Sequence, residues 1–146
     1  MTDVDDRADL LRDVPLFAAC TEDELARIAA LAKPRSAAAG DELCKQGDPG
    51  DEFFVLLDGG ADVLVDGDKV TVFTSGSFFG EMALIDGGER TATVVATAPC
   101  ELLVLDRHDF NEMLSTAMPH IVPRLVQTMG QRIRELAKHA GQPLPY

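Results

Sequence analysis

The chain has 146 residues, of which 46% are hydrophobic, and a formal net charge of −12. This length supports one sizeable core, so we predict a single domain. Between positions 41 and 68 nine acidic residues face a single lysine, which argues against direct binding of nucleic acid. The longest apolar runs have five residues, far short of the roughly 20 that a membrane-spanning helix requires.

Residues 1–12 are acidic and lack the basic segment and apolar stretch of a secretory signal, so we expect a cytoplasmic protein. Such a segment is typical of a solvated, mobile tail. We therefore predict tails at 1–12 and 141–146 around a domain at 13–140. Cys20, Cys44 and Cys100 fit neither a disulfide framework nor a metal-binding pattern, and we expect all three to be reduced.

The first clear element is a helix from about Glu22 to Ala32. Thr21 and Glu24 have the spacing of a capping box, in which each side chain accepts a hydrogen bond from the other's backbone N–H. Apolar residues then recur at helical spacing, which predicts one buried face.

The middle of the chain is predicted to be β-rich, because ten of the twelve glycines lie between positions 40 and 88. Residues 40–51 indicate turns, residues 52–57 a strand, and Ala61, Val63 and Val65 the inward face of the next strand. Asp66-Gly67 predicts a tight hairpin. Two further short strands at 91–97 and 101–105 continue this rhythm, which is typical of a sandwich or barrel.

From Arg107 onward the spacing becomes helical, and Pro119 and Pro123 suit the first turns of that helix. One apolar stripe comprises Val122, Leu125, Val126, Met129, Ile133 and Leu136. The stripe either packs on the barrel or pairs with its counterpart in a homodimer. The neighbouring cations Arg124, Arg132, Arg134 and Lys138 leave this choice open.

The most informative segment is 76–92, where small residues surround the carboxylate of Glu81 and the guanidinium of Arg90. Arg90 can offer a planar fork of donors to phosphate oxygens, and Glu81 can accept hydrogen bonds from a ribose hydroxyl. Gly80 permits close approach of the backbone, and residues 83–85 can begin a helical turn that faces an anion. The plainer alternative for Arg90 is a surface ion pair with Glu89 or Asp86.

The motif Phe79-Gly80-Glu81-Met82-Ala83-Leu84, followed by Arg90-Thr91-Ala92, resembles the phosphate-binding cassette of the cyclic nucleotide-binding domain family. That family includes catabolite activator proteins and protein kinase A regulatory subunits. Gly47-Asp48, Gly50-Asp51, Phe53-Phe54-Val55, Gly59 or Gly60, and Gly76 match the family in the same order. The resemblance spans roughly residues 13–138.

The resemblance implies a mainly β fold, an antiparallel β-roll or jelly-roll barrel with an N-terminal helix and a C-terminal helical lid. It implies that Glu81 and Gly80 hold the ribose, that Arg90 holds the cyclic phosphate, and that backbone amides near Ala83 and Thr91 hold the remaining oxygens. The implied ligand-binding set is Gly80, Glu81, Met82, Ala83, Arg90, Thr91 and Ala92. Thr91 is either a base contact or merely a strand-forming residue.

The expected function is that of a non-enzymatic sensor, which binds cAMP in preference to cGMP and signals through movement of its C-terminal helices. Candidate base contacts on the last helix are Gln127, Thr128, Gln131 and Arg134. We expect no catalytic cofactor, and an unknown effector protein or fused output domain as the partner. The site could also have lost its ligand and become a protein-interaction module.

A metal enzyme of the cupin kind has a similar shape but needs clustered histidine and carboxylate ligands on strands. His108, His120 and His139 lie instead in the helical region without metal-ligand spacing, so we predict no metal site.

Overall fold

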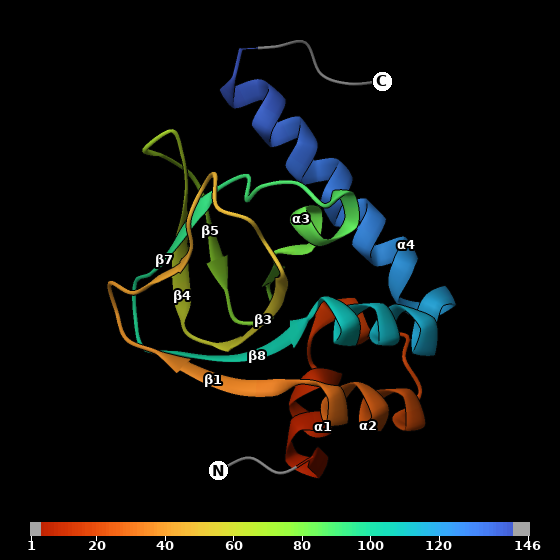
Figure 1. The fold of residues 1–146 in the computed structure, drawn as a ribbon. Helices are drawn as coiled ribbons and strands as arrows, with labels where there is room; N and C mark the ends of the chain where they lie inside the picture. The colour runs from red at the N-terminus through yellow and green to blue at the C-terminus, as the bar shows by residue number, and fades with distance from the viewer. Residues whose placement is uncertain (1–3, 142–146) are drawn as a thin grey trace.

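The computed structural model describes residues 4–141, which form two four-stranded antiparallel sheets flanked by helices (Figure 1). The strand orders are β1-β8-β3-β6 and β2-β7-β4-β5. The sheets curve into a roll rather than a closed barrel, which confirms the predicted β-roll class. The strands are β1 Lys33–Ala37, β2 Glu42–Cys44, β3 Glu52–Asp58, β4 Gly60–Val65, β5 Asp68–Thr74, β6 Phe78–Phe79, β7 Thr93–Ala96 and β8 Cys100–Asp106.

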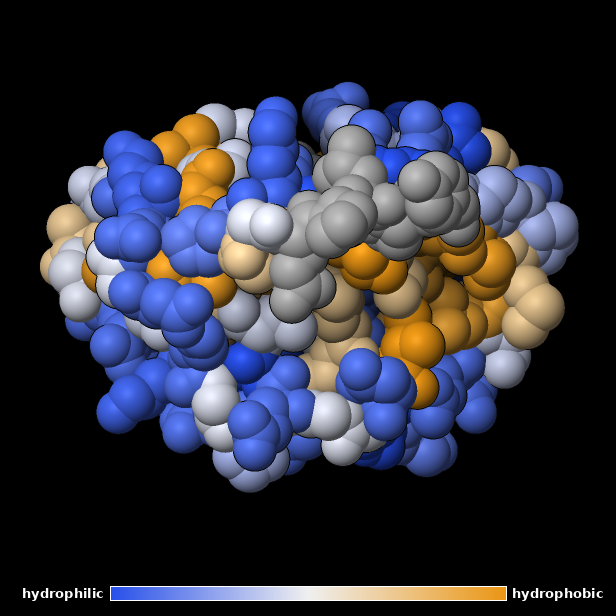
Figure 2. All heavy atoms as spheres, turned by 90° about the horizontal axis from the view of Figure 1, so that it is seen from above, coloured by the Kyte–Doolittle hydropathy of each residue, from blue (hydrophilic) through white to orange (hydrophobic). Residues whose placement is uncertain are grey.

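The last helix, α4 (Arg107–His139), is interrupted at Ala117, whose backbone is not helical (φ −135°, ψ 34°). Pro119 follows this break, in the first turn of the second segment, as the sequence predicted. The predicted apolar stripe is only partly buried: Leu125 is buried, whereas Val126 is 58% and Ile133 41% exposed. Figure 2 shows an apolar area on the side of the molecule where α4 lies. Within residues 4–141, no helix is long and apolar enough to cross a membrane.

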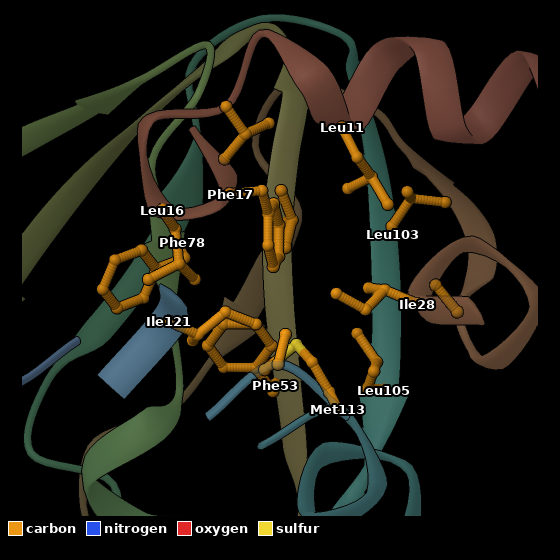
Figure 3. Close-up of a cluster of buried hydrophobic side chains, with 14 of the residues drawn as sticks. Leu11, Leu16, Phe17, Ile28, Phe53, Phe78, Leu103, Leu105, Met113 and Ile121 are labelled. Carbon is orange, nitrogen blue, oxygen red and sulfur yellow. The ribbon is translucent and has the colours of Figure 1, made fainter. Parts of the chain in front are cut away.

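Both faces of β3 are buried, because one is covered by helices and the other by the second sheet. Phe53 and Val55 point into a cluster with residues of α1 (Val4–Arg12), α2 (Glu22–Leu31) and α4 (Figure 3), whereas Phe54 and Leu56 point into the roll. This explains why the strand is almost continuously apolar instead of alternating. The same division holds for the neighbouring strand β8, whose Leu103 and Leu105 join the helical cluster.

The N-terminal helices include one element that the sequence analysis missed. Residues 4–12, predicted to be a mobile acidic tail, form helix α1 (Val4–Arg12), so that prediction was wrong. Leu11 is 1% exposed, and Arg7 donates hydrogen bonds to the carbonyls of Ala29 and Ala32 at the end of α2. Of the α1 side chains from residue 6 onward, two enter the core, those of Ala8 and Leu11, which left little apolar pattern to read. Residues 142–146 of the predicted C-terminal tail lie outside the described residues.

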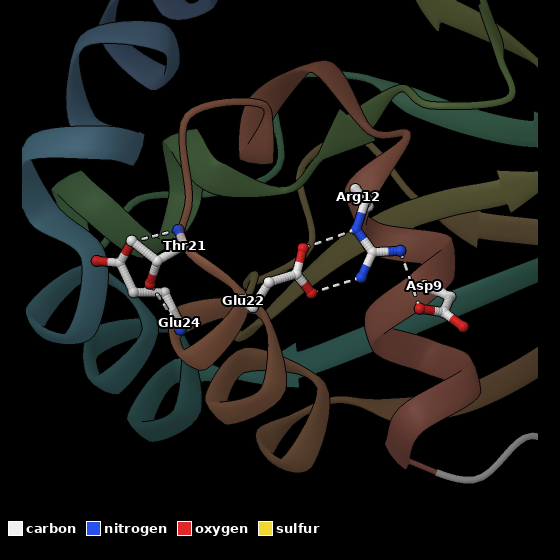
Figure 4. A network of polar contacts seen from close by, with 5 residues as sticks. All are labelled: Asp9, Arg12, Thr21, Glu22 and Glu24. Carbon is white, nitrogen blue, oxygen red and sulfur yellow. Dashed lines mark hydrogen bonds and ion pairs between the residues drawn. The ribbon is translucent and has the colours of Figure 1, made fainter.

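The predicted capping box is confirmed at helix α2 (Glu22–Leu31). The Thr21 hydroxyl accepts a hydrogen bond from the Glu24 N–H, and the Glu24 carboxylate accepts one from the Thr21 N–H (Figure 4). Between α1 and α2 lies the short 3₁₀ helix η1 (Pro15–Phe17). The predicted hairpin is also confirmed, because Asp66 (φ 54°) and Gly67 (φ 84°) make the turn that joins β4 and β5.

Candidate functional site

A cavity of about 240 Å³ lies between the second sheet, the short helix α3 (Glu81–Asp86) and α4. Its wall includes the four valines Val63, Val65, Val70 and Val94 and the ring of Phe73. All seven residues predicted to bind a ligand line this cavity: Gly80, Glu81, Met82, Ala83, Arg90, Thr91 and Ala92. The fold thus brings the predicted carboxylate of Glu81 and the predicted guanidinium of Arg90 to one cavity, whose wall combines apolar and polar side chains.

Gly80 permits the chain to turn sharply from β6 into α3. Its φ of 95° lies in the left-handed region that favours glycine. A Cβ atom at this position would lie 2.5 Å from the Glu52 carbonyl oxygen and 2.8 Å from Arg90 Nη1. Any side chain here would therefore displace the guanidinium as well as strain the backbone.

Arg90 is held in place by backbone carbonyls rather than by acidic side chains. Its Nη2 donates to the Glu52 carbonyl at 3.0 Å and its Nη1 to the Gly80 carbonyl at 3.3 Å. The guanidinium lies 5.6 Å from the centre of the Phe54 ring. The alternative of a surface ion pair with Glu89 or Asp86 does not occur. Because neutral carbonyls leave its charge uncompensated, Arg90 remains available to an anion.

Glu81 is 1% exposed and is the buried charged residue of this wall. Its carboxylate accepts a hydrogen bond from Arg132 Nη1 on α4 at 2.5 Å, and Arg132 Nη2 reaches the Phe78 carbonyl at 2.5 Å. The Arg132 guanidinium lies 4.9 Å and 4.8 Å from the ring centres of Phe73 and Phe78. A carboxylate has about four acceptor sites, so this contact leaves oxygen lone pairs on Glu81 for a second donor.

The sequence analysis did not identify Arg132 as part of the site. Its partner Glu81 lies 51 positions away in the chain, and no motif marks the arginine. Of the candidate base contacts on α4, Thr128 and Gln131 line the cavity, whereas Gln127 and Arg134 do not. The helix also contributes Glu135 and Leu136, which were not predicted.

The cavity wall includes one thiol, Cys44. Burial raises the pKa of Cys44 to about 11, which the nearby Arg90 only partly opposes. The group is therefore uncharged near neutral pH and behaves as part of the apolar wall. All three cysteines are free, as the sequence predicted.

The histidines lie away from this cavity. His108 forms the one group of metal-ligand types found among residues 4–141, with Asp106 and Asp109. His108 and Asp106 are exposed, and the Asp106 carboxylate already accepts the Asp109 N–H as the cap of α4. This arrangement caps the N-terminus of α4. It does not resemble the cluster of strand-borne metal ligands inside a cupin.

The chain is similar to known proteins in sequence and in fold. A family model described as the cyclic nucleotide-binding domain matches residues 34–117, more than half of the chain. A cyclic nucleotide-gated potassium channel of Rhizobium etli is 37% identical over 123 residues, which are 84% of this chain and 34% of the channel. A cAMP-dependent protein kinase regulatory subunit of Yarrowia lipolytica is 45% identical over 76 residues, which are 52% of this chain and 20% of the subunit.

The chain therefore spans about a third of the first relative and a fifth of the second. Among solved structures, a cAMP-bound PfPKA-R fragment superposes with a TM-score of 0.81 and 27% identity. The superposition covers 93% of this chain and 46% of that one.

Proposed function

The chain belongs to the cyclic nucleotide-binding domain family, and from this premise we propose that it is a sensor that binds cAMP in the cavity beneath α4. The observation that carries the proposal is the wall itself, where Arg90 and the buried Glu81 line one cavity. Arg90 offers its remaining N–H groups to the cyclic phosphate. Glu81 accepts the ribose 2′-hydroxyl.

The other five predicted residues have supporting roles in this proposal. Gly80 keeps the backbone close to the sugar, and the backbone amides near Ala83 and Thr91 donate to phosphate oxygens. Ala92 leaves room beside the ligand, and Met82 contributes to the wall. Their common position on one cavity supports this assignment.

For the base, we favour adenine over guanine. The cAMP-dependent kinase subunit and the cAMP-bound neighbour are similar to this chain over much of its length. Thr128 and Gln131 of α4 lie on the cavity wall and are placed to contact the base. Thr91 also lines the cavity, and its hydroxyl influences the choice between cAMP and cGMP without deciding it alone.

Signalling in this proposal runs through α4, which contacts the roll on both sides of the cavity. Arg132 binds Glu81 on one side, and His139 lies 3.9 Å from Asp66 at the hairpin tip on the other. The break at Ala117 separates this lid from the buried start of the helix. A nucleotide that binds the closed arrangement better shifts the population toward it, by no more than its preference for that state.

The remaining assignments follow from the family and from the exposed stripe of α4. The family is regulatory, so we propose no catalytic role, and an effector protein or fused output domain receives the signal. The exposed Val126 and Ile133 support a homodimer through α4. We propose that the binding domain comprises residues 13–140 together with α1. The cytoplasmic location stays a prediction.

Isothermal titration calorimetry with cAMP and with cGMP tests the proposal. We expect saturable binding at micromolar concentration or tighter, with cAMP the stronger ligand. Arg90→Ala should weaken binding by more than about 2 kcal/mol, because the phosphate loses its fork of donors, and Glu81→Ala should weaken it as well. Arg12→Ala is a matched control, because that arginine pairs with Asp9 and Glu22 on the surface.

Three other results would contradict the proposal. Absence of heat with either nucleotide would favour a protein-interaction module of the same fold. Heat with divalent metals alone would favour the cupin alternative. Unchanged affinity in Arg90→Ala would show that the nucleotide binds elsewhere.

A further inference from the structure

A second cavity, of about 390 Å³, lies on the other side of Arg132 from the nucleotide cavity. It is an open hollow lined by η1, by the turn between β5 and β6, and by α4. Leu16 and Phe78 form an apolar floor and are 2% and 6% exposed. Ligand pockets typically measure about 300–1,000 Å³, so the volume admits a small organic molecule.

Every polar side chain of this second cavity can donate a hydrogen bond. Two arginines line it, Arg124 and Arg132, together with the amides of Gln127 and Gln131 and the hydroxyl of Ser77. None of the described lining residues is an aspartate or glutamate, although the chain carries a net charge of −12. The cavity is therefore locally positive on an acidic protein.

The two arginines differ in what they bind. Arg132 is occupied by the Glu81 carboxylate and the Phe78 carbonyl. Arg124 has no hydrogen bond or ion pair with any residue from 4 to 141, and its field acts on the pKa of Cys20, which it lowers against the larger effect of burial. A free guanidinium above an apolar floor matches a ligand with an anionic head and an apolar body.

We propose that this second cavity binds a small organic anion, a phosphate or carboxylate on an apolar body, with Arg124 holding the head. The apolar body then covers Leu16 and Phe78, and the donors of Ser77 and Gln127 complete the contacts to the head. Binding at this place requires no nucleotide in the neighbouring cavity.

The second cavity also shares a wall with the first, because Thr128, Gln131 and Arg132 line both. An anion that draws Arg132 toward Arg124 leaves Glu81, which is 1% exposed, without its cationic partner. An unpaired buried charge is costly, so the anion destabilises the arrangement that binds nucleotide. This step rests on the proposed function, and it predicts that the anion and cAMP weaken each other's binding by the same factor.

The binding step is tested in the Arg90→Ala variant, in which the first cavity lacks the side chain proposed to bind phosphate. Phenyl phosphate is the probe, with inorganic phosphate and benzyl alcohol as the head alone and the body alone. We expect saturable NMR shifts of the Gly76, Ser77 and Gln127 amides. Adding Arg124→Gln should weaken phenyl phosphate about tenfold, as for loss of a charge-assisted contact. Adding Arg134→Gln, on the same helix but outside this cavity, should change nothing.

Scattered or non-saturating shifts, or equal affinity in the Arg124→Gln and Arg134→Gln proteins, would overturn the site. The coupling is tested separately by titrating cAMP into the unmodified protein with and without phenyl phosphate. We expect a severalfold weaker cAMP affinity that Arg124→Gln abolishes. Inhibition that persists in Arg124→Gln would mean direct competition in the first cavity and would overturn the coupling. If cAMP never binds while the probe still shifts Ser77, the proposed function fails and the second site stands.

Discussion

The two faces of the β1-β8-β3-β6 sheet pack against different parts of the fold, one against helices and the other against the inside of the roll. On one face Phe53 packs with Ile28, Met113 and Ile121 of the surrounding helices, and all four side chains are 0% exposed. The other face points into the roll, which ends in an open cavity with a buried ion pair. One region is dry and tightly packed, and the other keeps empty volume and a charge.

This difference suggests a division of labour between the two regions. Close packing gives the helical side its stability, because every buried methylene contributes. The cavity side gives up packing for a binding surface, as functional sites commonly do. Substitutions on the helical side should therefore alter stability and leave affinity intact, whereas substitutions on the cavity wall should alter affinity.

The largest effect is expected for Ile28→Ala in α2. Removing three carbons from a fully buried side chain should lower the free energy of unfolding by about 2–5 kcal/mol, measured by urea denaturation. Affinity for cAMP, measured on the folded protein by calorimetry, should stay unchanged because Ile28 does not line the cavity. A parallel loss of affinity would break the division between the two regions.

The next effect is expected for Gly80→Ala, with Gly87→Ala as its matched control. Both glycines have positive φ, 95° and 71°, but a Cβ atom at Gly87 meets nothing within 4 Å. Backbone strain and the clash with the Glu52 carbonyl should together lower the unfolding free energy of Gly80→Ala by about 2–4 kcal/mol. Gly87→Ala should show the backbone part alone.

The variants Gly80→Ala and Gly87→Ala also distinguish the effect of backbone strain from that of displacing Arg90. Calorimetry should show at least about tenfold weaker cAMP binding in Gly80→Ala, because the methyl group meets the Arg90 guanidinium. Binding by Gly87→Ala should be close to that of the unmodified protein. Equal losses in both variants would indicate that Arg90 is not fixed by Gly80.

A smaller effect is expected for Arg132→Ala, which leaves the buried Glu81 carboxylate without its cation. The free energy of unfolding should fall by about 1–3 kcal/mol, measured by urea denaturation against Arg134→Ala as the control on the same helix. Combining Arg132→Ala with Glu81→Gln should cost less than the sum of the two, since the pair is then removed together. Additive losses would mean that the two side chains do not interact in solution.

The parts of the fold that the sequence analysis predicted are those with a local signal. The capping box at Thr21 and the Asp66-Gly67 turn depend on neighbouring residues alone, and the cassette around Glu81 is a continuous motif. Strand β1 was missed because Lys33–Ala37 has no apolar alternation and owes its conformation to pairing with β8. Arg132 was missed for the same kind of reason, since only the tertiary fold brings it to Glu81.

The smallest effect is expected from acid. The carboxylates whose pKa is lowered lie on the helical side, so lowering the pH should reduce the stability of that side. The backbone N–H of Thr21 and then the side chain of His120, whose Nδ1 is 2.7 Å from Glu24 Oε1, lower the pKa of Glu24. A carboxylate with a lowered pKa in the folded state stabilises the fold fully above its unfolded value and ceases to do so as pH falls through the folded value. The unfolding free energy should therefore decrease below about pH 4.3.

Glu24→Gln should flatten that decrease in urea titrations between pH 6 and pH 3, whereas Glu112→Gln on the exposed face of α4 should leave it intact. Part of the slope should persist in Glu24→Gln, because the pKa values of Glu22, which is hydrogen-bonded to Arg12, and of Asp106, which caps α4, are lowered as well. Identical slopes in Glu24→Gln and the unmodified protein would mean that the contact between α2 and α4 does not hold Glu24 ionised. The acid response of the helical side would then originate from other carboxylates with a lowered pKa, such as Glu22 and Asp106.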